Sequence, residues 1–271
     1  METSVKFESF GFGKRIKSML KVDFRRMLRS KLFYIMIAAA LLVPILMTVM
    51  MTMMDGSVSV DPQTGAETVI HGPENAWQSI GTLPTEDGAA MGGMDVMSMC
   101  NVNMAFMGVC VFVCLFIADD FRSGYAKNLF TVRAKKGDYV ISKTLAGFVC
   151  GALMLIFYFI GAMLGGAISG LSFELPGMSA GNLAMCMLSK ILLMPVFVSI
   201  FTLISIAAKQ KAWLSICGSL GGGMLLFMTV PIITPLNSTL INVALCLIGG
   251  VLFALGMGAI SKTVLQKSSL V

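Results

Sequence analysis

Six long apolar segments constrain this chain more than any other feature. Because a bilayer core of about 30 Å needs roughly 20 apolar residues in helical form, each segment predicts a transmembrane helix. None alternates apolar and polar residues as the strands of membrane barrels do. We therefore expect an all-α membrane protein with six transmembrane helices. The segments cover residues 32–53, 101–118, 144–168, 185–208, 212–234 and 238–261.

Composition agrees with this prediction. Of the 271 residues, 56% are hydrophobic and only 13% are charged, which excludes an ordinary soluble domain. The first apolar segment is too long, and lies too far from the start, to be a cleaved signal peptide. We expect it to remain in the mature chain.

The basic residues predict how the helices are oriented, since Lys and Arg near helix ends are retained on the cytoplasmic side. Residues 1–31 contain nine of them, and the segments between helices two and three and between helices four and five contain most of the others. The segment 54–100 has no Lys or Arg but has seven acidic residues. It should face outward, with both termini in the cytoplasm of a multi-pass cell-membrane protein. The net charge of +6 is then concentrated on the cytoplasmic side, where it is attracted to anionic lipid. No nucleic-acid partner is needed to explain it.

The expected organisation follows from these segments. Residues 1–31 form a cytoplasmic arm, residues 32–261 form the transmembrane domain, and residues 262–271 form a cytoplasmic tail. Within the arm, apolar residues recur at helical spacing opposite a basic face, which predicts an amphipathic helix lying in the membrane interface. The alternative is a basic tail that acts only as a topology signal. The apolar residues of this interfacial helix are Phe12, Ile16, Met19, Leu20, Phe24, Met27 and Leu28.

A polar insert interrupts the apolar sequence between the second and third segments. Residues 118–143 hold nine charged residues, and Gly124 and Gly137 divide the insert. Between these glycines, aromatic and aliphatic residues are interleaved with basic ones, which predicts a short amphipathic helix followed by a basic turn. The alternative is a solvated loop that only satisfies the positive-inside rule.

No catalytic site and no metal site built from histidines is evident from the sequence. His71 is the single histidine, so one chain cannot assemble a Ser-His-Asp triad or a site built from several histidines. The seven cysteines lie in or beside the apolar segments, where we expect them to pack as small apolar residues. The predicted spans contain no Asp or Glu, which argues against an ion-coupled carrier.

Two other features have competing interpretations. Lys190 lies inside a predicted span and is a candidate contact for an anionic group of a transported molecule, or for pairing between helices. The eighteen residues from Ile191 to Ala208 would already span about 27 Å, so we expect its ammonium group to reach water at the outer boundary. Met91, Met94, Met97, Met99 and Cys100 could bind monovalent copper, although methionine also fills apolar volume elsewhere in the chain.

Small residues and prolines are placed inside several spans. Glycines four apart, such as Gly147 with Gly151 and Gly161 with Gly165, predict close helix contacts or a partner interface. Pro44, Pro195 and Pro231 should each kink the helix that contains it.

The polar insert and the overall layout resemble the ABC-2 type permease family, the membrane subunits of one class of ATP-binding-cassette exporter. The resemblance rests on an acidic residue at the end of span two (Asp119 or Asp120), on Gly124, Asn128 and Leu129, on residues 133–136, and on Tyr139 and Lys143. It implies that residues 121–136 form a coupling helix that docks on a separate ATPase subunit. The residues assigned to coupling in segment 119–143 are Asp119, Asp120, Arg122, Gly124, Tyr125, Lys127, Leu129, Phe130, Arg133, Lys135, Lys136, Tyr139 and Lys143.

The resemblance also implies partners and a mode of action. Two copies of a cytoplasmic ATPase would bind ATP and Mg, and this chain would bind no cofactor itself. A second permease copy, identical or homologous, would complete the route for the cargo. Uncharged spans favour amphipathic or lipophilic cargo, and small permeases of this kind resemble exporters of toxic or antimicrobial peptides, including the phenol-soluble modulin exporter. A self-powered channel or ion-coupled carrier, and a copper-handling membrane protein, are the alternatives.

Overall fold

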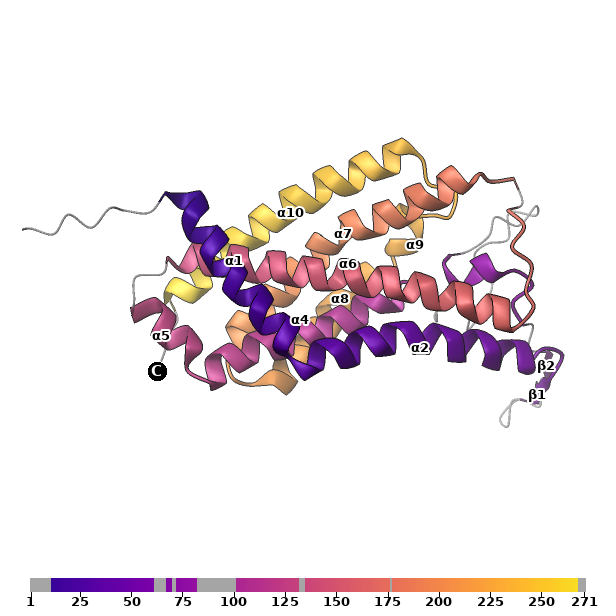
Figure 1. Cartoon of the computed structure of the whole chain (residues 1–271), viewed down its shortest axis with the longest axis horizontal. Helices are drawn as coiled ribbons and strands as arrows, with labels where there is room; N and C mark the ends of the chain where they lie inside the picture. Colours follow the sequence, from indigo (N-terminus) through magenta and orange to yellow (C-terminus); the bar gives the residue numbers. More distant parts are fainter. Residues whose placement is uncertain are drawn as a thin grey trace, which may run out of the picture.

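The computed structural model describes residues 11–60, 67–69, 72–81, 101–131, 135–175 and 177–267, and the described chain is dominated by helices (Figure 1). Five of its helices are long and apolar enough to cross a membrane. This confirms a multi-pass architecture. The five are α2 (Lys31–Met53), α4 (Met104–Arg122), α6 (Lys136–Ile168), α7 (Ala180–Ala208) and α10 (Leu240–Lys267).

The fifth predicted span, 212–234, differs from the other five. It contains α8 (Ala212–Phe227), whose 16 residues rise only about 24 Å, and a separate short helix α9 (Val230–Ile233). Pro231 does not kink a continuous helix but lies in the first turn of α9, where the missing N–H of proline removes no helical hydrogen bond. The six-span count therefore remains a prediction.

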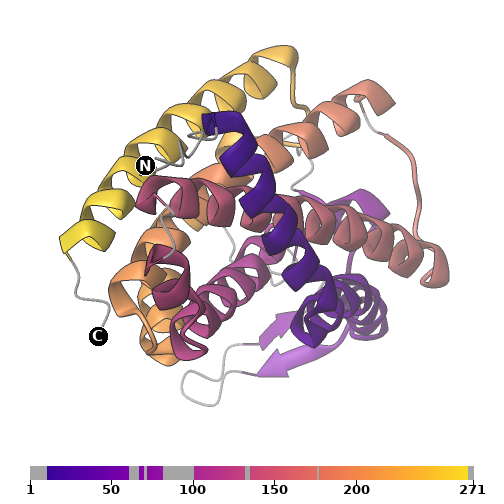
Figure 2. The ribbon, with the colours of Figure 1, turned by 60° about the vertical axis from the view of Figure 1, so that its left-hand side comes forward.

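The two ends of the bundle carry different elements. Helix α1 (Phe12–Arg29), helix α5 (Tyr125–Thr131), the start of α6 and the end of α10 lie together, and we call this the α1 end (Figures 1 and 2). The opposite end carries the antiparallel strands β1 (Val58–Val60) and β2 (Glu67–Val69) and the 3-10 helix η1 (Ala76–Ser79). We call it the hairpin end. It includes the described parts of the predicted outer loop 54–100.

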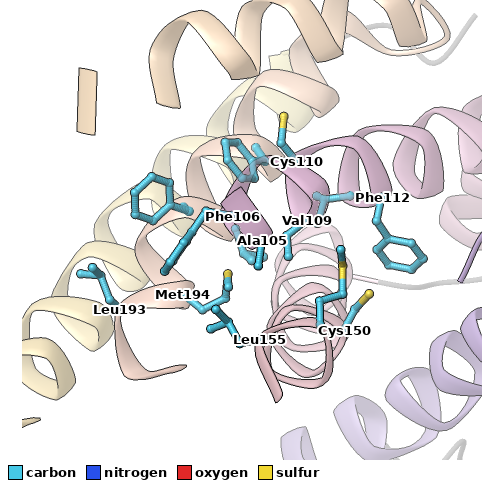
Figure 3. Close-up of a cluster of buried hydrophobic side chains, with 14 of the residues drawn as sticks. Ala105, Phe106, Val109, Cys110, Phe112, Cys150, Leu155, Leu193 and Met194 are labelled. Atoms are coloured by element: carbon cyan, nitrogen blue, oxygen red, sulfur yellow. The ribbon is translucent and has the colours of Figure 1, made fainter. Parts of the chain in front are cut away.

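Helix α4 forms the centre of the apolar core. Figure 3 shows Phe106, Val109 and Phe112 of this helix beside residues of α6 and α7. The ring of Phe106 lies 4.7 Å from that of Phe197, measured between centroids. Five cysteines are buried in the bundle without disulfides, as expected for packing residues, whereas Cys217 is exposed. The five are Cys110, Cys114, Cys150, Cys186 and Cys246.

Glycine allows close contact where the predicted pairs meet neighbouring helices. A Cβ atom added at Gly161 would collide with the carbonyl oxygen of Leu41 in α2, and one at Gly165 would lie 3.1 Å from the Cα of Ile45. The prediction of close helix contacts is therefore confirmed for α2 and α6. In contrast, a Cβ added at Gly249 or Gly256 of α10 would meet nothing within 4 Å.

Burial separates the central helices from the peripheral ones. In the most apolar part of α4, 61% of the residues are buried, against 17% in α10 and 22% in α2. Exposed apolar side chains on α10 include Leu245, Leu252 and Leu255. Such apolar faces are suited to contact with the hydrocarbon core of a membrane rather than with water.

Candidate functional site

Four charged side chains from three helices meet at the α1 end, and we call them the charge cluster. They are Asp23 and Arg26 of α1, Asp120 of α4 and Lys143 of α6. The Nζ atom of Lys143 lies 2.7 Å from Asp23 Oδ1 and 2.7 Å from Asp120 Oδ2. The side chains of Lys143, Asp23 and Asp120 are completely buried.

Further donors complete the bonding of both carboxylates. Arg26 Nη1 donates to Asp120 Oδ1 at 2.5 Å, and the hydroxyl of Tyr139 donates to Asp120 Oδ2 at 2.9 Å. The hydroxyl of Ser142 donates to Asp23 Oδ2 at 2.5 Å. Two carboxylates thus face two cations, and every carboxylate oxygen has a donor. Such complete pairing is what makes buried charges tolerable.

Helical spacing explains why these side chains converge. Asp23 lies four residues from both Met19 and Met27, and all three are buried on the side of α1 that faces the bundle. Tyr139 and Lys143 are also four residues apart, on one side of α6. Both lie within the helix because α6 begins at Lys136, eight residues before the apolar segment predicted from residue 144. Asp120 lies in the last turn of α4.

Aromatic rings attach helix α5 to the cluster. The guanidinium carbon of Arg26 lies 4.2 Å from the ring centroid of Tyr125, the first residue of α5. Near the other end of α5, Phe130 makes an edge contact with the ring of Tyr139 at 5.4 Å. Cation–π and edge-to-face contacts of this kind are favourable. Helix α5 is therefore joined to both α1 and α6.

The environment shifts two pKa values outside the membrane-spanning helices. Burial acts to lower the pKa of Arg26, but the charge and hydrogen bond of Asp120 outweigh it, so the net pKa is raised. Burial is the largest cause of a raised pKa at Tyr125, and the charges of Asp23 and Asp120 add to it. Arg26 thus stays charged and Tyr125 stays neutral at ordinary pH.

The structure brings some of the predicted coupling residues together and separates others. Asp120 and Lys143 belong to the cluster. Three other predicted residues contact it directly, and Asp119 among them lies 3.4 Å from Arg26 Nη2; the other two are Tyr125 and Tyr139. Phe130 contacts Tyr139. Arg122 instead donates to the carbonyl of Gln210 at 3.0 Å. Lys136 donates to the carbonyl of Leu265 at 2.8 Å.

The remaining coupling residues occupy α5 and its ends. Lys127 and Lys135 are exposed, and Leu129 is half-buried. Gly124 has a φ of 71°, in the left-handed region that favours glycine, and it makes the turn between α4 and α5. The predicted coupling helix over 121–136 is therefore shorter than expected, because this turn ends α4 at Arg122 and α6 begins at Lys136. Arg133 lies outside the described residues.

The apolar residues predicted for the interfacial helix do not all face one way. Met19 and Met27 are buried against the bundle, and Ile16, Leu20 and Phe24 are half-buried. Phe12 and Leu28 are exposed at 58% and 50%. Sequence reasoning missed Asp23 as a site residue, although its position in line with Met19 and Met27 was an available signal.

Lys190 is completely buried near the hairpin end, so the expectation that it reaches water is wrong. Its Nζ atom donates to Asn103 Oδ1 at 2.8 Å, to Thr234 Oγ1 at 3.0 Å and to the Thr234 carbonyl at 3.3 Å. It therefore joins α7 to the residues that precede α4 and follow α9. Among the described residues, no carboxylate pairs with it.

Metal binding has no support in the part of the chain that the structure describes. There, no group of three or more His, Cys, Asp or Glu side chains could hold a metal ion. The candidate copper ligands from Met91 to Cys100 lie outside the described residues, so that hypothesis is untested.

Comparison with known proteins identifies the family. The family model described as "ABC-2 family transporter protein" matches residues 19–229, well over half of the chain. The chain belongs to this family. The match covers the charge cluster and α5, and it identifies a transport permease rather than an enzyme. Permeases of this family generally work with an ATPase subunit. A search of curated proteins and a search of solved structures each found no match.

Proposed function

We propose that this chain is the transmembrane permease subunit of an ATP-driven exporter, and that α5 is the helix on which a separate ATPase subunit docks. The observation that carries the proposal is the charge cluster, which joins α5 to α1 and α6 through buried ion pairs and aromatic contacts. A helix that receives force from a partner must be firmly connected to the helices that it moves.

The exposed side of α5 supplies the docking surface in this proposal. Lys127, Asn128 and Thr131 are exposed, whereas Ala126 is completely buried against the bundle. Lys127 would make charge-assisted contacts with an acidic groove of the ATPase. Lys135 is exposed but lines a separate groove beside α10, and Lys136 is engaged with α10, so the proposed docking surface is limited to α5.

Force would pass from α5 to the membrane helices through the charge cluster. Separating Lys143 from Asp23 or Asp120 would leave buried charges unpaired, which is costly. Helices α1, α4 and α6 should therefore move with α5 as one rigid body when two ATPase subunits close on ATP. Such rigid-body rocking is a common way to alternate access in transporters.

The placement of charge supports a cytoplasmic α1 end. Basic residues of α1, α5 and the last turn of α10 lie there, and Arg122 contacts the segment after α7 at the same end. By the positive-inside rule, this end lies on the cytoplasmic side of the cell membrane. Helix α1 would then lie in the inner interface, with Phe12 and Leu28 directed to lipid. Both termini would be cytoplasmic.

The proposed cargo is an amphipathic or lipophilic molecule, with a small peptide as the preferred candidate. The cargo would pass between this chain and a second permease copy, identical or homologous, and two ATPase subunits would bind ATP and Mg. Lys190 is the candidate contact for an anionic group of the cargo, because its charge has no carboxylate partner among the described residues.

Co-purification tests the docking proposal directly. The tagged chain would be expressed with its ATPase and purified in mild detergent, beside the variant Lys127→Glu/Asn128→Glu. The matched control is Thr263→Glu/Lys267→Glu, which places the same charges on exposed positions of α10 at the same end.

We expect the ATPase to be recovered with the wild type and the control, and to be lost from the α5 variant. Recovery of equal ATPase with all three proteins would overturn the assignment of α5. Transport by the purified chain without any nucleotide would instead support a self-powered channel or carrier.

A further inference from the structure

A groove of about 630 Å³ lies at the α1 end, on the opposite side of α6 from helix α5. It is formed where the start of α1, the first turns of α6 and the last half of α10 lie side by side (Figure 2). The charge cluster does not line it. The lining residues are Phe12, Arg15, Lys135, Lys136, Gly137, Asp138, Val140, Ile141, Ala254, Leu255, Gly258, Ala259, Lys262 and Gln266.

The rim of the groove is strongly cationic. Arg15, Lys135, Lys136 and Lys262 line it with a single carboxylate, Asp138, which accepts a hydrogen bond from Arg15 Nε at 2.9 Å. Lys136 is bonded to a backbone carbonyl of α10. Lys135 and Lys262 are exposed, and neither ammonium group has an ion-pair or hydrogen-bond partner among the described residues. The rim therefore has cationic charge available for an anion.

The floor of the groove is apolar and follows the two membrane helices. Val140 and Ile141 of α6 face Leu255 and Ala259 of α10 across it. A Cβ added at Gly258 would meet nothing within 4 Å, so this part of the groove is open. A surface of this kind, running from a basic rim along spanning helices, suits an acyl chain.

We propose that this groove binds one anionic phospholipid from the leaflet at the α1 end. The phosphate would lie between Lys135 and Lys262, and an acyl chain would lie along Leu255 and Gly258. Basic pockets between membrane helices bind anionic headgroups in this way. A soluble phosphate would leave the apolar floor unused, and a zwitterionic lipid would leave the cationic rim uncompensated.

The bound lipid would also have a structural role. Its headgroup would join the start of α6 to α10, in addition to the hydrogen bond from Lys136 to the Leu265 carbonyl. The proposal requires that α6 and α10 cross a bilayer, but it does not depend on docking by α5. It therefore goes beyond the proposed function.

Native mass spectrometry of the detergent-purified full chain tests the proposal. Phosphatidylglycerol and phosphatidylcholine would be titrated separately, and glycerol 3-phosphate would be added as a soluble competitor. The charge variant is Lys135→Gln/Lys262→Gln, and its control Lys14→Gln/Lys267→Gln removes two exposed lysines outside the groove. The steric variant is Gly258→Leu, and its control is Gly256→Leu, which is equally open but outside the groove.

We expect phosphatidylglycerol to bind more tightly than phosphatidylcholine. Since each lysine near a headgroup contributes on the order of 1 kcal/mol, the charge variant should bind about tenfold or more weakly than its control. Gly258→Leu should weaken binding of both lipids, and Gly256→Leu should not. Equal affinity for the two lipids, equal binding by the charge variant and its control, or displacement by glycerol 3-phosphate would overturn the proposal. The assay contains no ATPase, so its result is independent of the docking experiment.

Discussion

Two lysines are buried in the part of the chain that the structure describes, and they are accommodated in different ways. At the α1 end, Lys143 lies 2.7 Å from each of two carboxylates. Near the hairpin end, Lys190 lies among neutral oxygens of Asn103 and Thr234. The first charge is neutralised within the protein, whereas the second has no anionic partner among the described residues. Lys143 is thus neutralised by carboxylates of neighbouring helices, whereas Lys190 is held by hydrogen bonds to neutral groups.

The difference has a physical consequence for movement. An ion pair that is fully buried resists separation, because each partner would be left uncompensated in a medium of low dielectric. The α1 end should therefore move as a unit. A buried cation without a counter-ion is a functional-site candidate in a membrane protein, because its cost would be reduced by binding an anion.

Replacing Lys143 should have the largest effect on stability. Lys143→Met leaves Asp23 without a cation, and removing one partner of a buried pair costs about 3–5 kcal/mol. The double variant Lys143→Met/Asp23→Asn keeps the pair of Arg26 with Asp120 and should recover much of this loss. Unfolding in detergent, followed by circular dichroism, measures both. If the double variant were less stable than the single one, charge pairing would not be what stabilises this end.

Tyr139→Phe should have an intermediate effect. It removes one donor from Asp120 while leaving Arg26 and Lys143 in place, and a hydrogen bond to a charged group is worth about 1.5–3 kcal/mol. The same unfolding measurement applies. Tyr34→Phe, at an exposed position of α2, is the control. A loss no greater than that of the control would mean that Asp120 is satisfied without the phenol.

Lys190→Met should change stability little, within about 1.5 kcal/mol, because losing hydrogen bonds is offset by no longer burying a charge. If Lys190 contacts cargo, the same variant should lower the uptake of an anionic test peptide into inverted vesicles and spare a neutral one. A destabilisation as large as that of Lys143→Met would remove the distinction between the two lysines. Equal uptake of both peptides would contradict the cargo contact.

High pH should have the smallest effect, and it acts on α5. A raised pKa at Tyr125 means that the folded state favours the neutral phenol, so this contribution is complete below the ordinary value of 10.0 and is lost as the pH rises through the folded value. Protection of α5 amides from hydrogen exchange should therefore fall, relative to α4, above pH 10.0. Tyr125→Phe should lack this change. Persistence of the change in Tyr125→Phe would assign it to another group.

Much of the α1 end could be predicted from sequence, and one part could not. The acidic residue after the second apolar segment and the residues Tyr139 and Lys143 were identified through the family resemblance. The position of Asp23 in line with Met19 and Met27 indicated that it faces the bundle, but its partner could not be predicted, because Lys143 lies 120 residues away in sequence. Only tertiary packing of α1 against α6 brings the two together.

The hairpin end was harder to predict for related reasons. The depth of Lys190 in the membrane was estimated by counting residues from Ala208. That estimate assumes that the side chain is free to extend toward water. In the structure α7 begins at Ala180, and the segment after α9 covers Lys190. Hydropathy also joined residues 212–234 into one span, although the chain there forms two helices.

ATP hydrolysis by the partner ATPase tests the central claim most directly. The chain would be reconstituted in vesicles with its ATPase, as wild type, as Lys127→Glu/Asn128→Glu and as the α10 control Thr263→Glu/Lys267→Glu. If α5 receives the ATPase, the wild type and the control should raise hydrolysis above that of the ATPase alone, and the α5 variant should not. Equal hydrolysis with all three chains, at equal insertion, would contradict the account.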